Sequence, residues 1–143
     1  MNSTKLDRAL SALSGRPCTY AYVLQNRTRF YLGLGAALAV GLATGVLIHQ
    51  WLVGTTVVVA LTFVTAPLFD RRIVGLNANG VVQAKCVSFG ARPTELLAPL
   101  EFTEVQVLGN RALDTAAFRI NGTTFLGNKG SSALAGALQQ KQA

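Results

Sequence analysis

The longest apolar segment of the chain runs from Phe30 to Phe69 and contains no Asp, Glu, Lys or Arg. A bilayer core of about 30 Å takes about 20 apolar residues per helix, so this segment has room for two crossings. The pattern predicts a first helix over Phe30–Ile48, a tight turn at His49–Trp51 and a second helix over Leu52–Phe69. We therefore expect a transmembrane helical hairpin over residues 30–69.

Small residues recur at every fourth position of the first predicted crossing. They are Gly33, Ala37, Gly41 and Gly45. Close backbone contact at small residues drives helix pairing in lipid, so this ridge predicts a packed partner helix. The short turn favours the second crossing as that partner, and a second copy of the protein is the alternative. Neither crossing holds a charged residue, which argues against a pump or transporter.

Before the hairpin, the hydrophobic periodicity predicts a short amphipathic helix over residues 4–14. Its apolar face consists of Leu6, Ala9, Leu10 and Leu13. Thr4 and Asp7 approximate a capping box at its start. This helix either lies on the inner leaflet or packs on protein, namely the C-terminal domain or a neighbouring subunit. The β-prone segment Cys18–Leu24 is either a strand of the downstream sheet or a lead-in to the membrane.

Beyond the hairpin the pattern changes to short alternating segments, which are typical of strands. Arg72–Leu76 and Val81–Phe89 flank a turn rich in Asn and Gly, and they predict a β-hairpin. Thr94–Leu97 is expected to form a single helical turn. The remaining predicted elements are a strand at Leu100–Leu108, a turn at Gly109–Asn110, a hairpin of Ala116–Ile120 and Thr123–Leu126 around Asn121–Gly122, and a helix at Ala133–Gln140 capped by Ser131 or Ser132.

This order of elements resembles that of the bacterial pleckstrin-homology-like (PH-like) membrane proteins. The stretches that carry the resemblance are DRRIVGLNANGVVQAKCVSF, LEFTEVQVL and FRINGTTFLGNKGSSALAGALQQ, within residues 27–140. The resemblance is one of layout and transfers no functional residue. It implies an α+β membrane protein in which a two-helix transmembrane hairpin is followed by a small PH-like antiparallel β domain with a C-terminal helix.

The charge pattern adds a topology. The chain has 13 Lys and Arg against 6 Asp and Glu, a formal net charge of +7. Basic residues lie before the first crossing and after the second, and the turn between the crossings has none. The positive-inside rule therefore predicts a multi-pass protein of the cell inner membrane with both termini cytoplasmic, and no cleavable signal peptide is expected. Because topology explains most of the excess charge, no nucleic-acid partner is expected.

Four arginines flank the hairpin. They are Arg27, Arg29, Arg71 and Arg72. We expect them to form a basic collar that contacts acidic lipid headgroups, each contributing about 1 kcal/mol near an anionic surface. The two cysteines, Cys18 and Cys86, are expected to be free thiols in a reducing compartment.

The residues that carry most enzyme chemistry do not form a recognisable constellation. The single His49 falls in the predicted outer turn, where neither a His-based metal site nor a Ser-His-Asp arrangement is plausible. GNKGSS lacks the spacing of a phosphate loop and is expected to be a loop with an N-cap. Glu101 and Glu104 would face opposite sides of a strand and so form no pair. We expect no enzyme, no cofactor, no metal and no small-molecule substrate.

The sequence thus divides into an N-terminal lead-in over residues 1–29, the hairpin over 30–69 and a cytoplasmic β-rich domain over 70–143. The first hypothesis is a non-enzymatic membrane protein whose β domain mediates self-assembly, partner binding or acidic-lipid contact at the membrane surface. The alternative is a small subunit of a secretion, conjugation or other membrane transport complex. In both, the partners are membrane lipid together with further copies of the chain or a larger complex.

Overall fold

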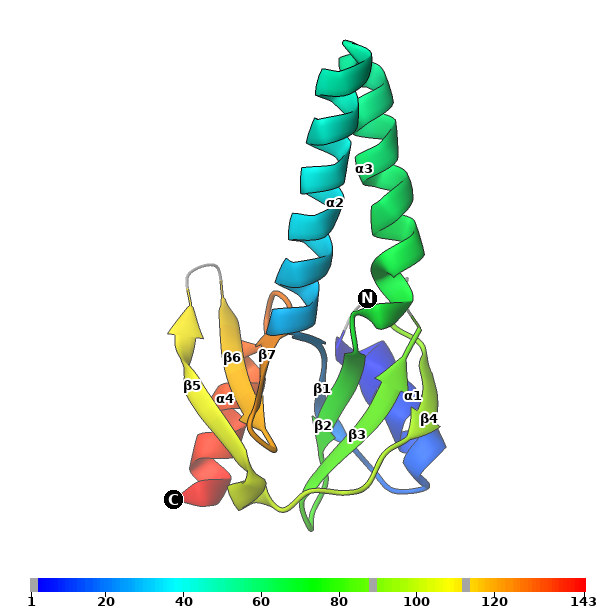
Figure 1. Ribbon diagram of the computed structural model, residues 1–143. Helices are drawn as coiled ribbons and strands as arrows, with labels where there is room; N and C mark the ends of the chain where they lie inside the picture. The colour runs from blue at the N-terminus through cyan, green and yellow to red at the C-terminus, as the bar shows by residue number, and fades with distance from the viewer. Residues whose placement is uncertain (1–2, 88–89, 112–113) are drawn as a thin grey trace. The chain divides into compact units, whose positions relative to one another are not determined.

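The computed structural model describes residues 3–87, 90–111 and 114–143, and it has an α+β fold (Figure 1). The helical elements are α1 (Ser3–Ser14), α2 (Arg27–Ile48), α3 (Trp51–Thr65), η1 (Ala66–Leu68), η2 (Phe102–Glu104) and α4 (Ser132–Gln142), and the strands are β1 (Thr19–Asn26), β2 (Arg71–Leu76), β3 (Val81–Cys86), β4 (Pro93–Leu96), β5 (Val105–Arg111), β6 (Thr115–Ile120) and β7 (Thr123–Gly127). The chain divides into two compact units, a hairpin unit of Arg27–Asp70 and a β-rich unit of Met1–Asn26 with Arg71–Ala143. The N-terminal segment and the C-terminal part of the chain therefore fold together.

The hairpin unit consists of the long helices α2 and α3, which run side by side (Figure 1), and the short helix η1. The turn between α2 and α3 is shorter than expected, since α3 already begins at Trp51. His49 reverses the chain with a positive φ of 55°, and the amide of Gln50 donates to the Gly45 carbonyl at 3.1 Å. Pro67 lies in η1, at the end of the second predicted helix. The predicted two-helix hairpin is confirmed.

The strands of the described residues form one seven-stranded antiparallel sheet in the order β4-β3-β2-β1-β7-β6-β5. Strands β1 to β4 follow one another in this order, as do β5 to β7, and the two groups join where β1 pairs with β7. The segment Cys18–Leu24, whose role the sequence left open, thus contributes to β1 at the centre of the sheet. The predicted hairpin at Asn121–Gly122 is confirmed, and both residues have the positive φ that its tight turn requires.

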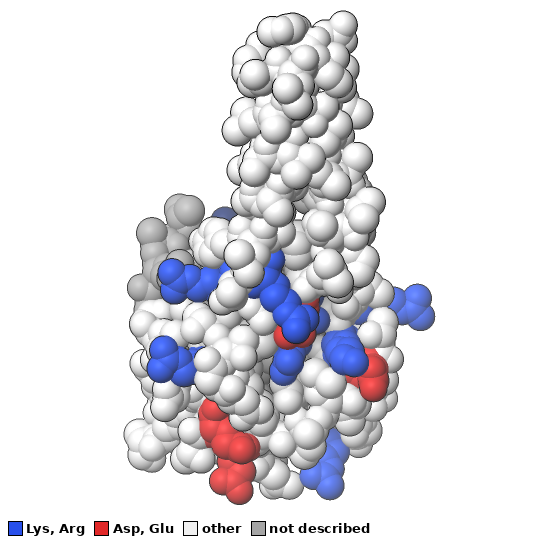
Figure 2. Space-filling model, viewed as in Figure 1, with Lys and Arg blue, Asp and Glu red and all other residues white. Residues whose placement is uncertain are grey.

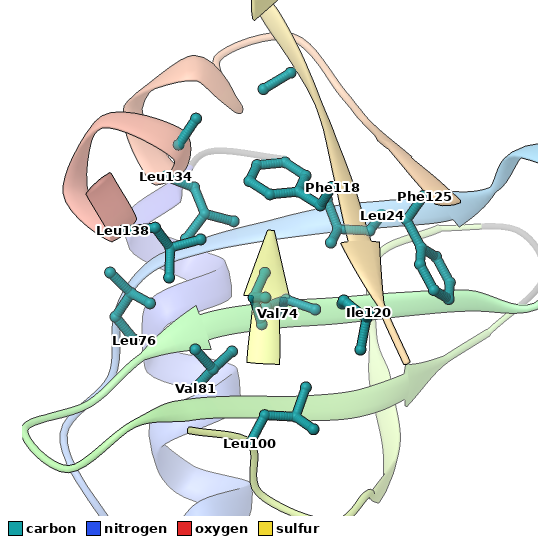
Figure 3. Close-up of a cluster of buried hydrophobic side chains, with 13 residues drawn as sticks. Leu24, Val74, Leu76, Val81, Leu100, Phe118, Ile120, Phe125, Leu134 and Leu138 are labelled. Carbon is teal, nitrogen blue, oxygen red and sulfur yellow. The ribbon is translucent and has the colours of Figure 1, made fainter. Parts of the chain in front are cut away.

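Side chains of β2 alternate between two hydrophobic clusters, one on each face of the sheet. Val74 belongs to a cluster with β5, β6, β7 and α4, where Leu134 and Leu138 of α4 lie among the sheet residues (Figure 3). Ile73 belongs to the cluster on the other face, which α1 covers with Leu6 and Leu10. The β-rich unit therefore has three layers, with α1 outside, strands β1 to β3 in the middle, and β5 to β7 with α4 on the far side.

The apolar face of α1 packs on protein of its own chain. Leu6 and Leu10 are 1% and 0% exposed, whereas Leu13 is 39% exposed. The capping box predicted from Thr4 and Asp7 is wrong, because α1 already includes Ser3 and Thr4 is therefore not the residue that precedes the helix; Asp7 is bonded elsewhere. Its carboxylate accepts a hydrogen bond of 2.7 Å from the backbone N–H of Ala21, and this bond ties α1 to β1.

Three local predictions between β3 and β6 are wrong. Thr94–Leu97 is not a helical turn, because residues Pro93–Leu96 pair with β3 as the edge strand β4, helped by an ion pair of 3.1 Å between Lys85 and Glu95. Leu100–Leu108 is only partly a strand, since η2 precedes β5. Gly109–Asn110 does not turn the chain but lies within β5 at a register shift, where Gly109 has a φ of 108°. Phe89 at the end of the predicted second strand lies outside the described residues.

Glu101 and Glu104 correct a further expectation. The sequence placed them on opposite sides of a strand, but Glu101 is the N-cap and Glu104 the third residue of the 3-10 turn η2, and together they form a reciprocal capping box. The backbone N–H of Glu101 donates to a carboxylate oxygen of Glu104 at 2.6 Å. Their role here is to start β5 at the right position, because each carboxylate satisfies a backbone donor that the single turn leaves open.

Candidate functional site

The hairpin unit buries its small residues between the two helices. Ala37, Gly41 and Gly45 are the buried residues of α2, and Gly54 is the buried residue of α3. A Cβ atom on Gly41 would overlap the side chain of Val58 and lie 2.8 Å from the Gly54 carbonyl oxygen. The ridge predicted from the sequence is therefore occupied by the chain's own second helix, and Gly33 fits the same scheme because a Cβ there would overlap the ring of Phe69.

The large apolar residues of the hairpin point outward. Leu47 and Leu52 are 80% and 84% exposed, and Leu32, Val64 and Leu68 are also mostly exposed. Between Phe30 and Phe69 the hairpin is a continuous uncharged surface on the face seen in Figure 2. The threonines do not make it polar, since Thr55 and Thr56 donate to the carbonyls of Trp51 and Leu52 in their own helix at 2.9 and 2.8 Å.

A hollow of about 470 Å³ opens at the Arg29 end of the hairpin. It is lined by Arg29, Leu32, Gly33, Thr65, Leu68 and Phe69. The ring of Phe69 stands edge-on to Phe30 with 5.8 Å between the ring centroids, and it occupies the space that a side chain at position 33 would fill. One cation beside exposed leucines suits an amphiphile with an anionic head and an apolar tail.

The structure places the four predicted collar arginines in two settings. Arg27 and Arg29 are exposed in the first turn of α2, whereas Arg71 and Arg72 are half-buried in β2. Their places in the chain are linked through β1 and β2, because Gln25, two residues before α2, pairs with Arg71. The chain therefore leaves the β-rich unit and returns to it at neighbouring strand ends.

Arg72 has a structural role within the β-rich unit. Its guanidinium donates to the side-chain oxygen of Gln83 at 3.1 Å and lies 4.9 Å from the centroid of the Phe125 ring. The Gln83 amide in turn donates to the carbonyl of Ala98 at 2.9 Å. Arg72 therefore connects β2, β3 and β7, which the sequence did not predict because these partners come together only when the sheet forms.

The two serines of the GNKGSS loop make hydrogen bonds within the β-rich unit. Ser131 precedes α4, but its hydroxyl makes no capping bond and instead accepts from the backbone N–H of Ala116 at 2.9 Å. The hydroxyl of Ser132 donates to the carboxylate of Asp114. Gly127, the last residue of β7, lies so close to Ser131 that a Cβ on Gly127 would overlap the Ser131 side chain. These contacts fix the start of α4 against β6 and β7.

The titratable groups that could carry chemistry lie apart. Among the described residues, no three His, Cys, Asp or Glu side chains gather in a way that could hold a metal ion. His49 is exposed in the turn of the hairpin. Cys18 is buried and Cys86 half-buried, both as free thiols. Burial raises the pKa of the Cys86 thiol, against a smaller opposing effect of Arg71, so this thiol is a weak nucleophile near neutral pH.

Comparisons with protein-family models, with characterised proteins and with solved structures found no match to this chain. The surfaces described above are therefore the basis for a functional proposal.

Proposed function

We propose that this chain is a non-enzymatic, multi-pass protein of the cell inner membrane, in which α2 and the α3–η1 segment cross the bilayer. Both termini face the cytoplasm, and the β-rich unit is a PH-like domain that mediates self-assembly, partner binding or acidic-lipid contact at the membrane surface. The observation that carries the proposal is the burial pattern of the hairpin, in which glycines are buried between the helices and leucines are exposed.

The energetic argument starts from the outward leucines. Full burial of a leucine side chain is worth about 1.5–3 kcal/mol relative to water, and Leu47 and Leu52 forgo nearly all of it within the chain. Soluble monomers rarely expose a contiguous apolar surface larger than a few hundred Å². Helices satisfy their own backbone polar groups, which is the condition for residing in hydrocarbon. Lipid is therefore the covering that this surface fits best.

The PH-like assignment is supported by layout. An apolar two-helix hairpin lies next in sequence to β2, and an antiparallel sheet follows in which α4 contributes Leu134 and Leu138 to the core. The hairpin is inserted between β1 and β2, so the domain includes a strand that precedes it. In this proposal the two membrane passages start from the paired ends of adjacent strands, since Gln25 of β1 pairs with Arg71 of β2.

The alternative function, a small subunit of a larger membrane complex, requires a different use of the same surface. The small-residue ridge already contacts α3, so a partner subunit that binds the hairpin would meet the outward leucines instead of the ridge. The native mass of the protein after gentle extraction separates the alternatives. A mass of one chain, or of a whole number of copies, supports lipid contact or self-assembly, and a stable larger partner that co-purifies supports the complex subunit.

Topology can be tested by thiol labelling. His49→Cys places a thiol in the exposed turn of the hairpin, and Gln139→Cys places one on the exposed side of α4. A membrane-impermeant maleimide should label His49→Cys in intact cells and Gln139→Cys only after permeabilisation, with the parent protein as background control. Labelling of both positions in intact cells, or of neither before lysis, would contradict the proposed topology.

Acidic-lipid contact can be tested at the hollow beside Arg29. In nanodiscs of mixed anionic and zwitterionic lipid, native mass spectrometry should find anionic lipid retained by the parent protein. Arg29→Gln should reduce this retention severalfold, because Arg29 lines the hollow. Arg27→Gln is the matched control, since Arg27 lies in the same helical turn but does not line the hollow. Equal losses in the two variants would favour a diffuse charge effect.

A further inference from the structure

The β-rich unit has a hollowed surface at the end of β2 that lies away from the two chain passages. β2 begins beside a passage at Arg71 and ends at Leu76, where the turn of residues 77–80 leads into β3. Three hollows of about 410, 380 and 280 Å³ lie around this turn, and Arg16 and Asn77 line all three. We call these three hollows, which share Arg16 and Asn77, the turn-end groove.

The largest hollow of the turn-end groove combines cationic groups with apolar surface. Arg16 and Lys141 line it together with Leu76 and Ala137, and no acidic residue is among the described residues that line it. Among the described residues that line the other two hollows, the one carboxylate is that of Glu101, in the second hollow. A ligand that complements this surface carries negative charge beside an apolar group.

Tyr20 gives the same hollow an unusual feature. It lines the hollow and has a φ of 54°, a conformation that is rare and strained for a bulky side chain. The register of β1 against β2 shifts between Thr19 and Tyr22, so the strain falls at a bulge. Tyr20 is 46% exposed, and core burial therefore does not offset the cost of this conformation. Residues held in this way are found preferentially at binding sites.

We propose that the turn-end groove binds an extended segment of a protein partner that carries acidic and apolar side chains. A carboxylate would meet Arg16 and Lys141, and an apolar side chain would pack on Leu76 and Ala137 beside the Tyr20 ring. Three adjoining hollows suit an extended peptide better than a single small anion. The proposal rests on the β-rich unit alone and does not require that the hairpin be inserted in lipid.

The test uses the full-length protein in nanodiscs and a displayed library of random peptides. Peptides are selected on the parent protein and counter-selected on the double variant Arg16→Glu/Lys141→Glu. Enriched peptides should contain acidic and apolar residues, and fluorescence anisotropy should show binding about tenfold weaker or more for each single charge reversal. Lys129→Glu is the matched control, because Lys129 is exposed and lines none of the three hollows. It should leave the affinity unchanged.

Tyr20→Gly separates a binding role from a structural one. Glycine adopts a positive φ without strain, so this variant should unfold at the same or a higher temperature while losing peptide affinity. The proposal is overturned if the library yields no peptide that distinguishes the parent from the double variant, or if Lys129→Glu weakens binding equally. It is also overturned if inorganic phosphate displaces the enriched peptide at comparable concentration, which would identify a small-anion site instead.

Discussion

The hairpin unit and the β-rich unit bury opposite kinds of residue. In the β-rich unit the largest fully buried side chains include Phe118 and Phe125, which pack in the cluster below α4. In the hairpin unit the buried positions of the two long helices are glycines and an alanine, while Leu47 and Leu52 face outward. One chain thus contains both a hydrophobic core of the ordinary kind and its inverse.

The difference is the one expected if water surrounds the β-rich unit and lipid surrounds the hairpin unit, as we propose. In water, apolar area drives packing, so large side chains collect inside. In lipid, apolar area gives no such force, and helices associate through close contact between small residues. The β-rich unit follows the first rule and the hairpin unit the second. This contrast separates the hairpin from a buried helix pair of a soluble protein, which would hide its leucines.

Removal of the hairpin should have the largest effect. Because Gln25 pairs with Arg71, a short Asn-Gly turn in place of Arg27–Asp70 would join two neighbouring antiparallel strands. We expect this shortened chain to stay in solution without detergent and to keep the β-sheet signal in circular dichroism. The full-length chain should stay in the membrane fraction after carbonate washing. A shortened chain that unfolds would show that the β-rich unit depends on the hairpin.

The next largest effect is expected in the layer formed by α1. Leu10→Ala removes a fully buried side chain that packs on the sheet, and comparable core truncations cost about 2–5 kcal/mol. Leu13→Ala on the same helix should cost clearly less than Leu10→Ala, because Leu13 is 39% exposed and loses less buried area. Chemical denaturation of the full-length protein in detergent measures both. Equal small losses would mean that α1 contributes little to the core.

The sequence reveals a face of α1 but not what that face contacts. The spacing of the leucines determines which side chains share a face of the helix, and either lipid or protein could cover that apolar face. The deciding contacts are made with β1, β2 and β3, one of which precedes the hairpin and two of which follow it. For the same reason, no local signal showed that Arg72 reaches Gln83 and Phe125 rather than a lipid headgroup.

Elements whose signals are local were predicted well. The apolar composition of residues 30–69 and the Asn121–Gly122 pair each determine the local structure without distant contacts. The structure contains a helical hairpin and a β-hairpin there. β4 was missed because Thr94–Leu97 has good helix formers, and pairing with β3 overrides that preference. The bulge of β5 at Gly109 resembles a turn in the sequence, because glycine is common both in bulges and in turns.

A smaller effect is expected from filling the contact between the helices of the hairpin. Gly41→Leu forces a side chain into Val58 and the Gly54 backbone, and overpacking of this kind costs about 1–3 kcal/mol. Gly35→Leu is the matched control, because a Cβ there meets nothing within 4 Å. The single tryptophan, Trp51, lies near Gly45 and reports thermal separation of the helices by fluorescence.

The same pair of variants tests the rival use of the small-residue ridge. Because the ridge faces α3, neither variant should change the native mass in nanodiscs. A lower assembled mass for Gly41→Leu but not for Gly35→Leu would show that the ridge also holds a second copy of the chain.

The smallest expected effect concerns the thiol of Cys86, which packs against the cluster under α1. Burial raises its pKa, so at the pH where an ordinary thiol titrates, a larger fraction of Cys86 than of an ordinary thiol is still protonated. Alkylation by iodoacetamide, followed by mass spectrometry of the Cys86 peptide, should therefore reach half its maximal rate at a higher pH than a free cysteine peptide does. Leu10→Ala should move this midpoint back towards the ordinary value, because it admits water to the cluster. A midpoint at or below that of the free peptide would mean that the positive charge of Arg71 outweighs burial, and that α1 does not keep this face of the sheet dry.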